Sequence, residues 1–180
     1  TAFFRFYNKE TDKKNVIETA TISIFWTSLI FLIIALINRV ALAKFSGIDV
    51  QYVTYAIWIL VLDALVIVPF SKLRANQKPI FYAIIKIGNV TVNLLLNIFF
   101  LIFLPQWVKS SSNEFLQLIY FEDFQIGYIF VSLIASSLLT FIALSSDYLK
   151  INWHFDFKLW KKMMRYGLPI LVAGIAFAIN

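Results

Sequence analysis

The sequence predicts an all-α fold, a polytopic transmembrane helix bundle. Of its 180 residues 61% are hydrophobic and only 14% are charged, with a mean hydropathy of +0.79. Soluble domains are nearer half apolar and a quarter charged. Apolar runs long enough to cross the ~30 Å hydrocarbon core of a bilayer as helices recur along the chain, separated by short polar loops. Lys and Arg are concentrated in alternate loops, as in multi-pass membrane proteins.

Four complete spans and two partial ones account for these runs. The complete spans are expected at residues 16–37, 52–70, 80–104 and 125–145, and the partial ones at 1–7 and 167–180. Pro69 is expected to stop the second complete span, and a polar loop is expected from Pro105 to residue 124. Pro79 suits the first turn of a helix, where its missing N–H costs nothing. Because both ends fall inside apolar runs, we expect an internal fragment of a longer protein.

The distribution of Lys and Arg predicts the orientation in the membrane. Loops 8–15, 71–79 and 146–165, with Arg5 beside the first, hold 12 of the 16 basic residues, whereas loops 38–51 and 105–124 hold three. Basic loops stay on the cytoplasmic side. The first set of loops is therefore expected in the cytoplasm and the second outside. Within loop 38–51, a short interfacial helix is expected to end at Gly47.

The third complete span carries a polar stripe. Lys86, Asn89, Asn93 and Asn97 are spaced three, four and four residues apart, so they share one face of a helix, and Tyr82 extends that face by one turn. Such side chains are costly in hydrocarbon unless they are paired or hydrated. Two interpretations remain open. The asparagines form interhelical hydrogen bonds, or the stripe lines a polar lumen.

A carboxylate and an ammonium are expected at similar depth in the membrane. Asp63 lies six residues before Pro69, and Lys86 lies seven residues after Pro79, so both are about 10 Å above the cytoplasmic end. Joined by a tight turn, these antiparallel spans could bring the two charges together as a structural ion pair. Alternatively one or both line a transport path, with Asp63 carrying H⁺ or Na⁺.

Residues 157–166 have the pattern of an amphipathic helix. Leu159, Trp160, Met163 and Met164 fall on one side, and Lys158, Lys161, Lys162 and Arg165 on the other. Asp156 is the expected N-cap. We expect this helix to lie on the inner membrane surface with its basic face toward anionic head groups.

Several function classes have no support in the sequence. There is no cysteine and only one histidine, so no metal site is expected. No nucleophile–base arrangement, phosphate loop or H-E-x-x-H motif is present, so we expect a protein that is not an enzyme and has no cofactor. The net charge of +6 resides in loops between spans, where topology explains it, and no nucleic-acid partner is expected.

The order of four segments resembles bacterial polysaccharide-exporter flippases of the multidrug/oligosaccharidyl-lipid/polysaccharide transporter superfamily. The segments are TAFFRFYNKE, DALVIVPFSKLRANQKP, IKIGNVTVNLLLNIFF and FDFKLWKKMMRYGLPILVAGIA. The resemblance implies most of one six-helix lobe of a two-lobe transporter. Residues 1–146 would be a partial N-terminal lobe, 147–165 an inter-lobe connector and 166–180 the start of the seventh span.

The resemblance also implies a function in the bacterial cytoplasmic membrane. Such flippases move undecaprenyl-diphosphate-linked oligosaccharides across the membrane by alternating access, through cavities that tend to be cationic. The candidates for such a cavity are Arg5, Arg74 and Lys86, with the three asparagines facing the sugar, although Arg5 and Arg74 also suit interfacial anchors. Two alternatives remain: a cation-coupled multidrug antiporter of the same superfamily, and a polytopic glycan polymerase or acyltransferase.

Overall fold

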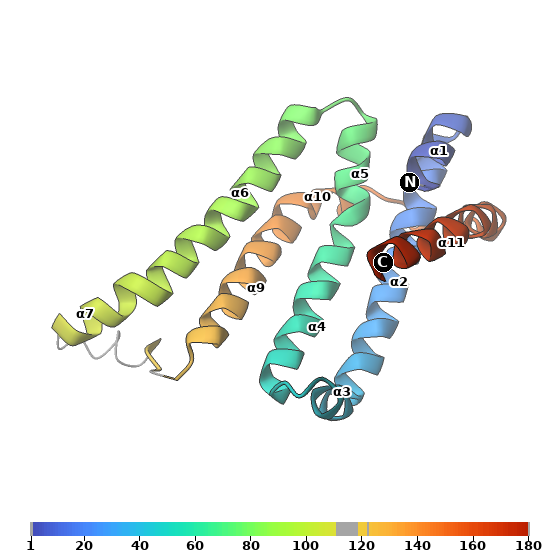
Figure 1. Cartoon of the computed structure of the whole chain (residues 1–180). Coiled ribbons are helices and arrows are strands. Elements are labelled where there is room, and N and C mark those ends of the chain that lie inside the picture. The colour runs from blue at the N-terminus through green and yellow to red at the C-terminus, as the bar shows by residue number, and fades with distance from the viewer. Residues whose placement is uncertain (1, 111–118, 122, 180) are drawn as a thin grey trace.

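The computed structural model describes residues 2–110, 119–121 and 123–179, and this part of the chain is helical with no strand (Figure 1). Its elements are α1 (Ala2–Lys9), α2 (Lys13–Ile37), α3 (Arg39–Ser46), α4 (Val50–Leu65), α5 (Ile67–Ala75), α6 (Pro79–Ile98), a π-helical turn (Phe99–Phe103), α7 (Leu104–Ser110), α9 (Gln125–Leu144), α10 (Ser146–Leu149) and α11 (Phe157–Ile179). Four helical stretches are long and apolar enough to cross a membrane: Lys13–Ile37, Val50–Ala75, Pro79–Val108 and Gln125–Leu149. The predicted all-α, multi-pass membrane fold is confirmed.

The long helices form a layer in the order α2, α4, α9, α6 (Figure 1). Helix α9 packs against both α4 and α6. The sequence suggested that the spans around Asp63 and Lys86 are neighbours. In the structure they are not neighbours along their length, because α9 lies between α4 and α6. They meet where α5 packs on α6, beside the tight turn between them. Helix α6 is an edge of the layer, and none of its residues is buried.

Small hydroxyl side chains let α9 occupy the middle of the layer. Ser132, Ser136 and Thr140 recur at every fourth residue and are buried. The Ser132 hydroxyl donates to the Tyr128 carbonyl at 2.8 Å, and the Thr140 hydroxyl donates to the Ser136 carbonyl at 2.9 Å. Because each hydroxyl is satisfied within its own helix, the seam can be buried without orphaned donors.

Three helices extend beyond the ends that the sequence predicted. The second complete span continues past Pro69 to Ala75, the third continues past Pro105 to Ser110, and α11 continues through Gly167 and Pro169. A π-helical turn, Phe99–Phe103, comes just before Pro105. Residues 111–118 and 122 of the predicted 105–124 loop, among them Glu114 and Glu122, lie outside the described residues. The predicted short helix is α3, and Gly47 ends it with φ = 69°.

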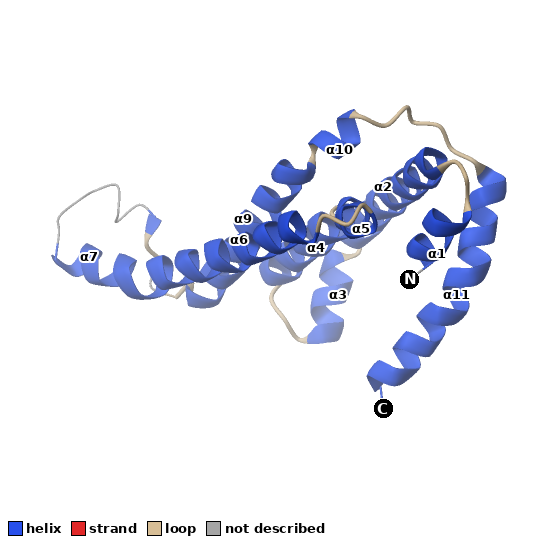
Figure 2. Ribbon diagram, turned by 90° about the horizontal axis from the view of Figure 1, so that it is seen from above, coloured by secondary structure: helices blue, strands red, loops and turns tan. Residues whose placement is uncertain are grey.

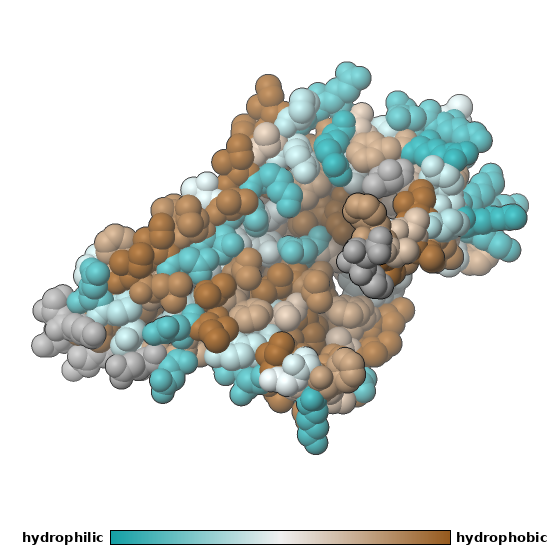
Figure 3. Space-filling view, viewed as in Figure 1, coloured by the Kyte–Doolittle hydropathy of each residue, from teal (hydrophilic) through white to brown (hydrophobic). Residues whose placement is uncertain are grey.

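The apolar face of α11 is partly occupied by the protein itself. Leu159 is buried in a cluster with Phe3 and Phe6 of α1 and Val16 of α2, and Met163 packs against that cluster. The Trp160 indole donates to the Ser23 hydroxyl at 2.9 Å. Part of the apolar side of residues 157–166 thus packs on α1 and α2, and the position of its basic side on the membrane surface stays a prediction. Hydrophilic residues gather over this part of the molecule, at the upper right of Figure 3.

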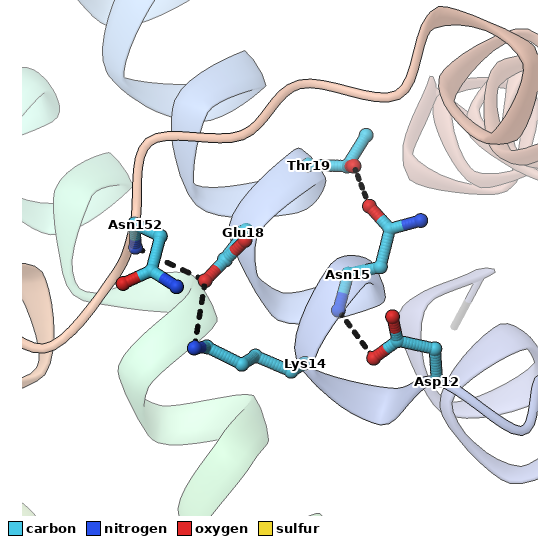
Figure 4. Close-up of polar contacts among 6 residues, drawn as sticks. All are labelled: Asp12, Lys14, Asn15, Glu18, Thr19 and Asn152. Carbon is cyan, nitrogen blue, oxygen red and sulfur yellow. Dashed lines mark hydrogen bonds and ion pairs between the residues drawn. The ribbon is translucent and has the colours of Figure 1, made fainter.

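The connector between α10 and α11 is held against the first turns of α2 (Figures 2 and 4). Glu18 is buried, and its carboxylate accepts the Asn152 backbone N–H at 3.0 Å and lies 3.8 Å from the Lys14 ammonium. The Asp156 N–H donates to the Thr19 hydroxyl at 3.2 Å. A buried carboxylate is stable here because it is both paired and hydrogen-bonded.

Asp156 caps α11, as predicted. Its carboxylate accepts the Leu159 N–H at 3.0 Å and the Asn15 side-chain amide at 3.1 Å. The Leu159 backbone N–H, followed by the Asn15 amide, holds the pKa of Asp156 below its usual value because both favour the charged form.

A lowered pKa in the folded state predicts acid-sensitive anchoring of α11. The stabilisation by Asp156 is fully present above the ordinary aspartate pKa, and it is lost as pH falls through the lowered value, below about pH 4. The protection factors of the first-turn amides of α11, which compare their hydrogen exchange with that of an unstructured chain at the same pH, should fall in that range in the parent protein. In Asp156→Asn these protection factors should already be lower at neutral pH and should vary less with acid. Glu10→Gln, which changes a carboxylate between α1 and α2 that does not cap α11, should behave like the parent. Identical acid profiles for all three proteins would contradict this role.

Candidate functional site

A pocket of about 430 Å³ lies where α4, α5 and α6 meet at the basic end of the bundle. Its polar side chains are those of Asp63, Arg74, Tyr82 and Lys86. Leu60, Ala64, Val66, Ile67 and Phe70 complete the lining. The pocket therefore joins three of the ionisable residues that the sequence analysis singled out.

A break in the helix shapes one wall of this pocket. Pro69 has no N–H to give to the carbonyl of Leu65, four residues earlier, so α4 ends there and α5 begins at Ile67. The Tyr148 hydroxyl of α10 donates to that Leu65 carbonyl at 2.5 Å. Because an unsatisfied carbonyl is costly away from water, Tyr148 stabilises the break that the proline creates.

Asp63 and Lys86 line the same pocket without forming an ion pair. The Asp63 carboxylate accepts a hydrogen bond from the Ser137 hydroxyl of α9 at 2.8 Å. The Lys86 ammonium lies 5.3 Å from the centre of the Phe70 ring. Both residues are exposed. In the described part of the chain, ion pairs join Lys14 to Glu18 and Lys72 to Asp147. The structural ion pair that the sequence left open is not formed in this structure.

The two arginine candidates lie in different surroundings. The Arg74 guanidinium is 5.2 Å from the Tyr82 ring centre and 5.3 Å from that of Phe4, so it lies between α6 and α1 at the edge of the pocket. The Arg5 guanidinium instead stacks over Tyr166 of α11, 4.2 Å from its ring centre. Arg5 is not among the residues that line the pocket.

The asparagine stripe faces α9 on one side. The Asn89 amide donates to the Thr140 hydroxyl at 2.9 Å, which is an interhelical hydrogen bond of the kind the sequence left open. The Asn97 amide donates to the carbonyl and the side-chain oxygen of Asn93, at 2.9 and 2.8 Å. The Asn97 side-chain oxygen is buried without a hydrogen bond from the described residues. In Figure 3, hydrophilic residues interrupt the hydrophobic surface along α6.

Sequence reasoning missed Ser137 and Tyr148. Ser137 is also buried, but it is one residue after Ser136, so the four-residue spacing of Ser132, Ser136 and Thr140 did not mark it. Tyr148 follows the last predicted span, and its partner is 83 residues away. A signal for Tyr148 existed, since a proline inside an apolar helix leaves a carbonyl that needs a donor.

The pocket can attract an anion and hold it near one carboxylate. Two cations and one carboxylate, all on exposed side chains, give the described lining a net charge of +1. The carboxylate is exposed and is accessible to a cation. Among the described residues, no group of three His, Cys, Asp or Glu side chains could hold a metal ion.

Comparisons of the chain with models of protein families, with characterised proteins and with solved structures found no match. The pocket and the helix layer therefore carry the functional argument that follows.

The Tyr148 hydrogen bond predicts a measurable cost when only the hydroxyl is removed. Tyr148→Phe should lower the stability of the purified protein by about 1 kcal/mol, because the Leu65 carbonyl loses its donor. Thermal unfolding in detergent is the measurement. Tyr166→Phe is the matched control, since its ring packs on Arg5 and its hydroxyl has no hydrogen bond within the described residues. Equal melting temperatures for both variants would refute the role of Tyr148.

Proposed function

We propose that the protein is a membrane transporter that moves a lipid-linked anionic substrate between leaflets. The substrate class that fits best is undecaprenyl-diphosphate-linked oligosaccharide, destined for surface polysaccharide. The proposal rests on one observation above the others: Lys86 and Arg74 project from different spans around one pocket at the basic end of the bundle. The resemblance in the order of sequence segments supports the same proposal.

The chemistry of the pocket suits a diphosphate. Arg presents a planar fork of donors to phosphate oxygens, and Lys supplies a compact charge. Lys86 is not neutralised by Asp63, so its charge is available to a ligand. Its approach to Phe70 leaves the ammonium only weakly held, since cation–π attraction at exposed sites is worth about 0.5–1 kcal/mol.

The proposed transport mechanism is alternating access, in which the pocket opens first to one side of the membrane and then to the other. The head group would enter from the cytoplasmic side while the prenyl chain remains in lipid, and the lobes of the transporter would rock about the site. Helix α6 supports this proposal because it is an edge of the layer, with the polar stripe on it and many apolar side chains exposed. The connector anchored on α2 would make α11 move together with the first complete span.

Removing the charge of Lys86 tests the proposal. In cells that carry the chromosomal variant Lys86→Ala, surface polysaccharide should fall about tenfold or more and lipid-linked precursor should accumulate, because a charged hydrogen bond to phosphate is lost. Lys86→Arg should retain export. Lys44→Ala, on α3 at the opposite end, removes one exposed charge and should export normally. Membrane levels of each variant are measured by immunoblot; normal export by Lys86→Ala at normal protein level would disprove the proposal.

A cation-coupled multidrug antiporter is the second candidate, and Asp63 favours it. This carboxylate is exposed in the pocket, and within the described residues its one hydrogen bond comes from Ser137, so it is accessible to a cation. A glycan polymerase ranks below both, because no described cluster of side chains supplies its chemistry.

Asp63→Asn tests whether Asp63 couples transport to an ion. Asn removes the charge but can still accept the hydrogen bond from the Ser137 hydroxyl. For a cation antiporter, efflux of a fluorescent cationic dye should stop in Asp63→Asn and continue in Lys86→Ala. For a coupled flippase, dye efflux should be absent in the parent, and Asp63→Asn should reduce polysaccharide export. Ser137→Ala controls for the lost hydrogen bond. If Asp63→Asn alters neither export nor efflux, Asp63 is not a coupling residue.

A further inference from the structure

A second and larger cavity, of about 820 Å³, lies at the opposite end of the bundle. It is formed where α4 begins and by residues 120, 121, 123 and 124, which precede α9. These segments lie at the lower end of Figure 1. Five aromatic side chains line it, among them Tyr52, Tyr55 and Phe124, together with Gln51 and Asp123. Its volume is within the range of small-molecule sites, about 300–1,000 Å³.

Neighbouring side chains, some of which also line the cavity, hold its aromatic rings in place. Tyr52 stacks on Phe130 of α9, with ring centres 5.6 Å apart and planes 17° apart, so one face of Tyr52 is covered. The Tyr55 hydroxyl accepts the Gln51 side-chain amide at 2.8 Å, and Phe124 meets the Tyr55 ring edge-on. Rings fixed in this way lose little conformational freedom when a ligand packs on them.

Besides three tyrosine hydroxyls, the polar groups of the cavity are a carboxylate and an amide. Asp123 is exposed, and Gln51 is exposed beside the N-cap aspartate of α4, Asp49. The described lining contains no Lys or Arg, in contrast to the pocket at the basic end. Carboxylate oxygens accept hydrogen bonds and amides both donate and accept, so the set suits a ligand rich in hydroxyl groups. It does not suit a phosphate.

We propose that this cavity is a saccharide-binding site. Tyr52, Tyr55 and Phe124 would pack on the apolar C–H faces of sugar rings, while Gln51 and Asp123 bind their hydroxyls. An organic cation would also be attracted to rings and a carboxylate. The size of the cavity favours one or more sugar rings, since a quaternary ammonium group needs a closer cage.

Only the identity of the saccharide, as the oligosaccharide of a lipid-linked substrate, rests on the proposed function. If the protein is a flippase, the basic pocket would hold the diphosphate on the cytoplasmic side, and the aromatic cavity would receive the oligosaccharide outside. Sugar binding itself does not require transport, so the two proposals fail independently.

The test is saturation-transfer NMR on the intact purified protein in nanodiscs. The probes are glucose, galactose, N-acetylglucosamine, rhamnose and maltose, with choline as the cationic probe. Transfer to sugar C–H protons is expected for at least one saccharide. Tyr55→Ala should weaken that binding about tenfold, the scale of one aromatic contact. Trp58→Ala, an exposed aromatic on the same helix that lines no described cavity, should bind like the parent.

Asp123→Asn distinguishes the two kinds of ligand. Asn can still hydrogen-bond a hydroxyl, so saccharide binding should fall less than in Tyr55→Ala, whereas a cation site would lose most of its affinity with the charge. Binding of choline but of no saccharide would overturn the proposal. Absence of binding by every probe would also overturn it, and the aromatic residues would then be interpreted as a belt at the membrane interface. If Lys86→Ala still binds saccharide and also exports polysaccharide normally, the saccharide site is supported and the flippase proposal is rejected.

Discussion

Hydrocarbon offers no hydrogen bonds, so every backbone group of a membrane-spanning helix must be satisfied within the protein. This constraint explains several otherwise unrelated features. Pro69 breaks the donor–acceptor ladder at Leu65, and Tyr148 of α10 supplies the missing donor. Hydroxyls buried along α9 donate hydrogen bonds to backbone carbonyls of the same helix, and the Asn89 amide donates to the Thr140 hydroxyl. The Tyr148 and Asn89 hydrogen bonds each join two helices, and the hydroxyls that are satisfied within α9 allow its neighbours to pack closely.

The polar pocket depends on that arrangement. The break at Val66 allows α5 to pack on α6 while α9 separates α4 from α6. Asp63 is then held by Ser137 of α9 and does not pair with Lys86. The two charges share a pocket at some distance from each other, so each remains available for a ligand or an ion. A direct ion pair would have removed that availability.

The two ends of the bundle differ in their chemistry. Cations and stacked guanidinium groups characterise the basic end, where α1, α11 and the connector are anchored on α2. Tyrosine, phenylalanine and a carboxylate line the cavity at the other end. A lipid-linked glycan has the same division, since its diphosphate is anionic and its sugars are neutral. Together, the proposed sites would bind these two parts of one substrate on opposite sides of the membrane.

The sequence by itself determined the helical class, the four spans, the α3 cap at Gly47 and the Asp156 cap of α11, because each depends on local hydropathy or on a short hydrogen bond. It also grouped Lys86 with the asparagines of α6 on one face, which helical geometry alone requires. Its expectations at Pro69, Pro105 and Gly167 were wrong, because contacts with other segments or a local change of helical pitch can carry a helix past such residues. The order of helices in the layer, the role of Ser137 and Tyr148 and the separation of Asp63 from Lys86 were decided only by the tertiary structure. The physical reason is that these features depend on contacts between distant segments, such as Asp63 with Ser137 and Leu65 with Tyr148, which are 74 and 83 positions apart. No local pattern encodes which distant helix will supply the partner.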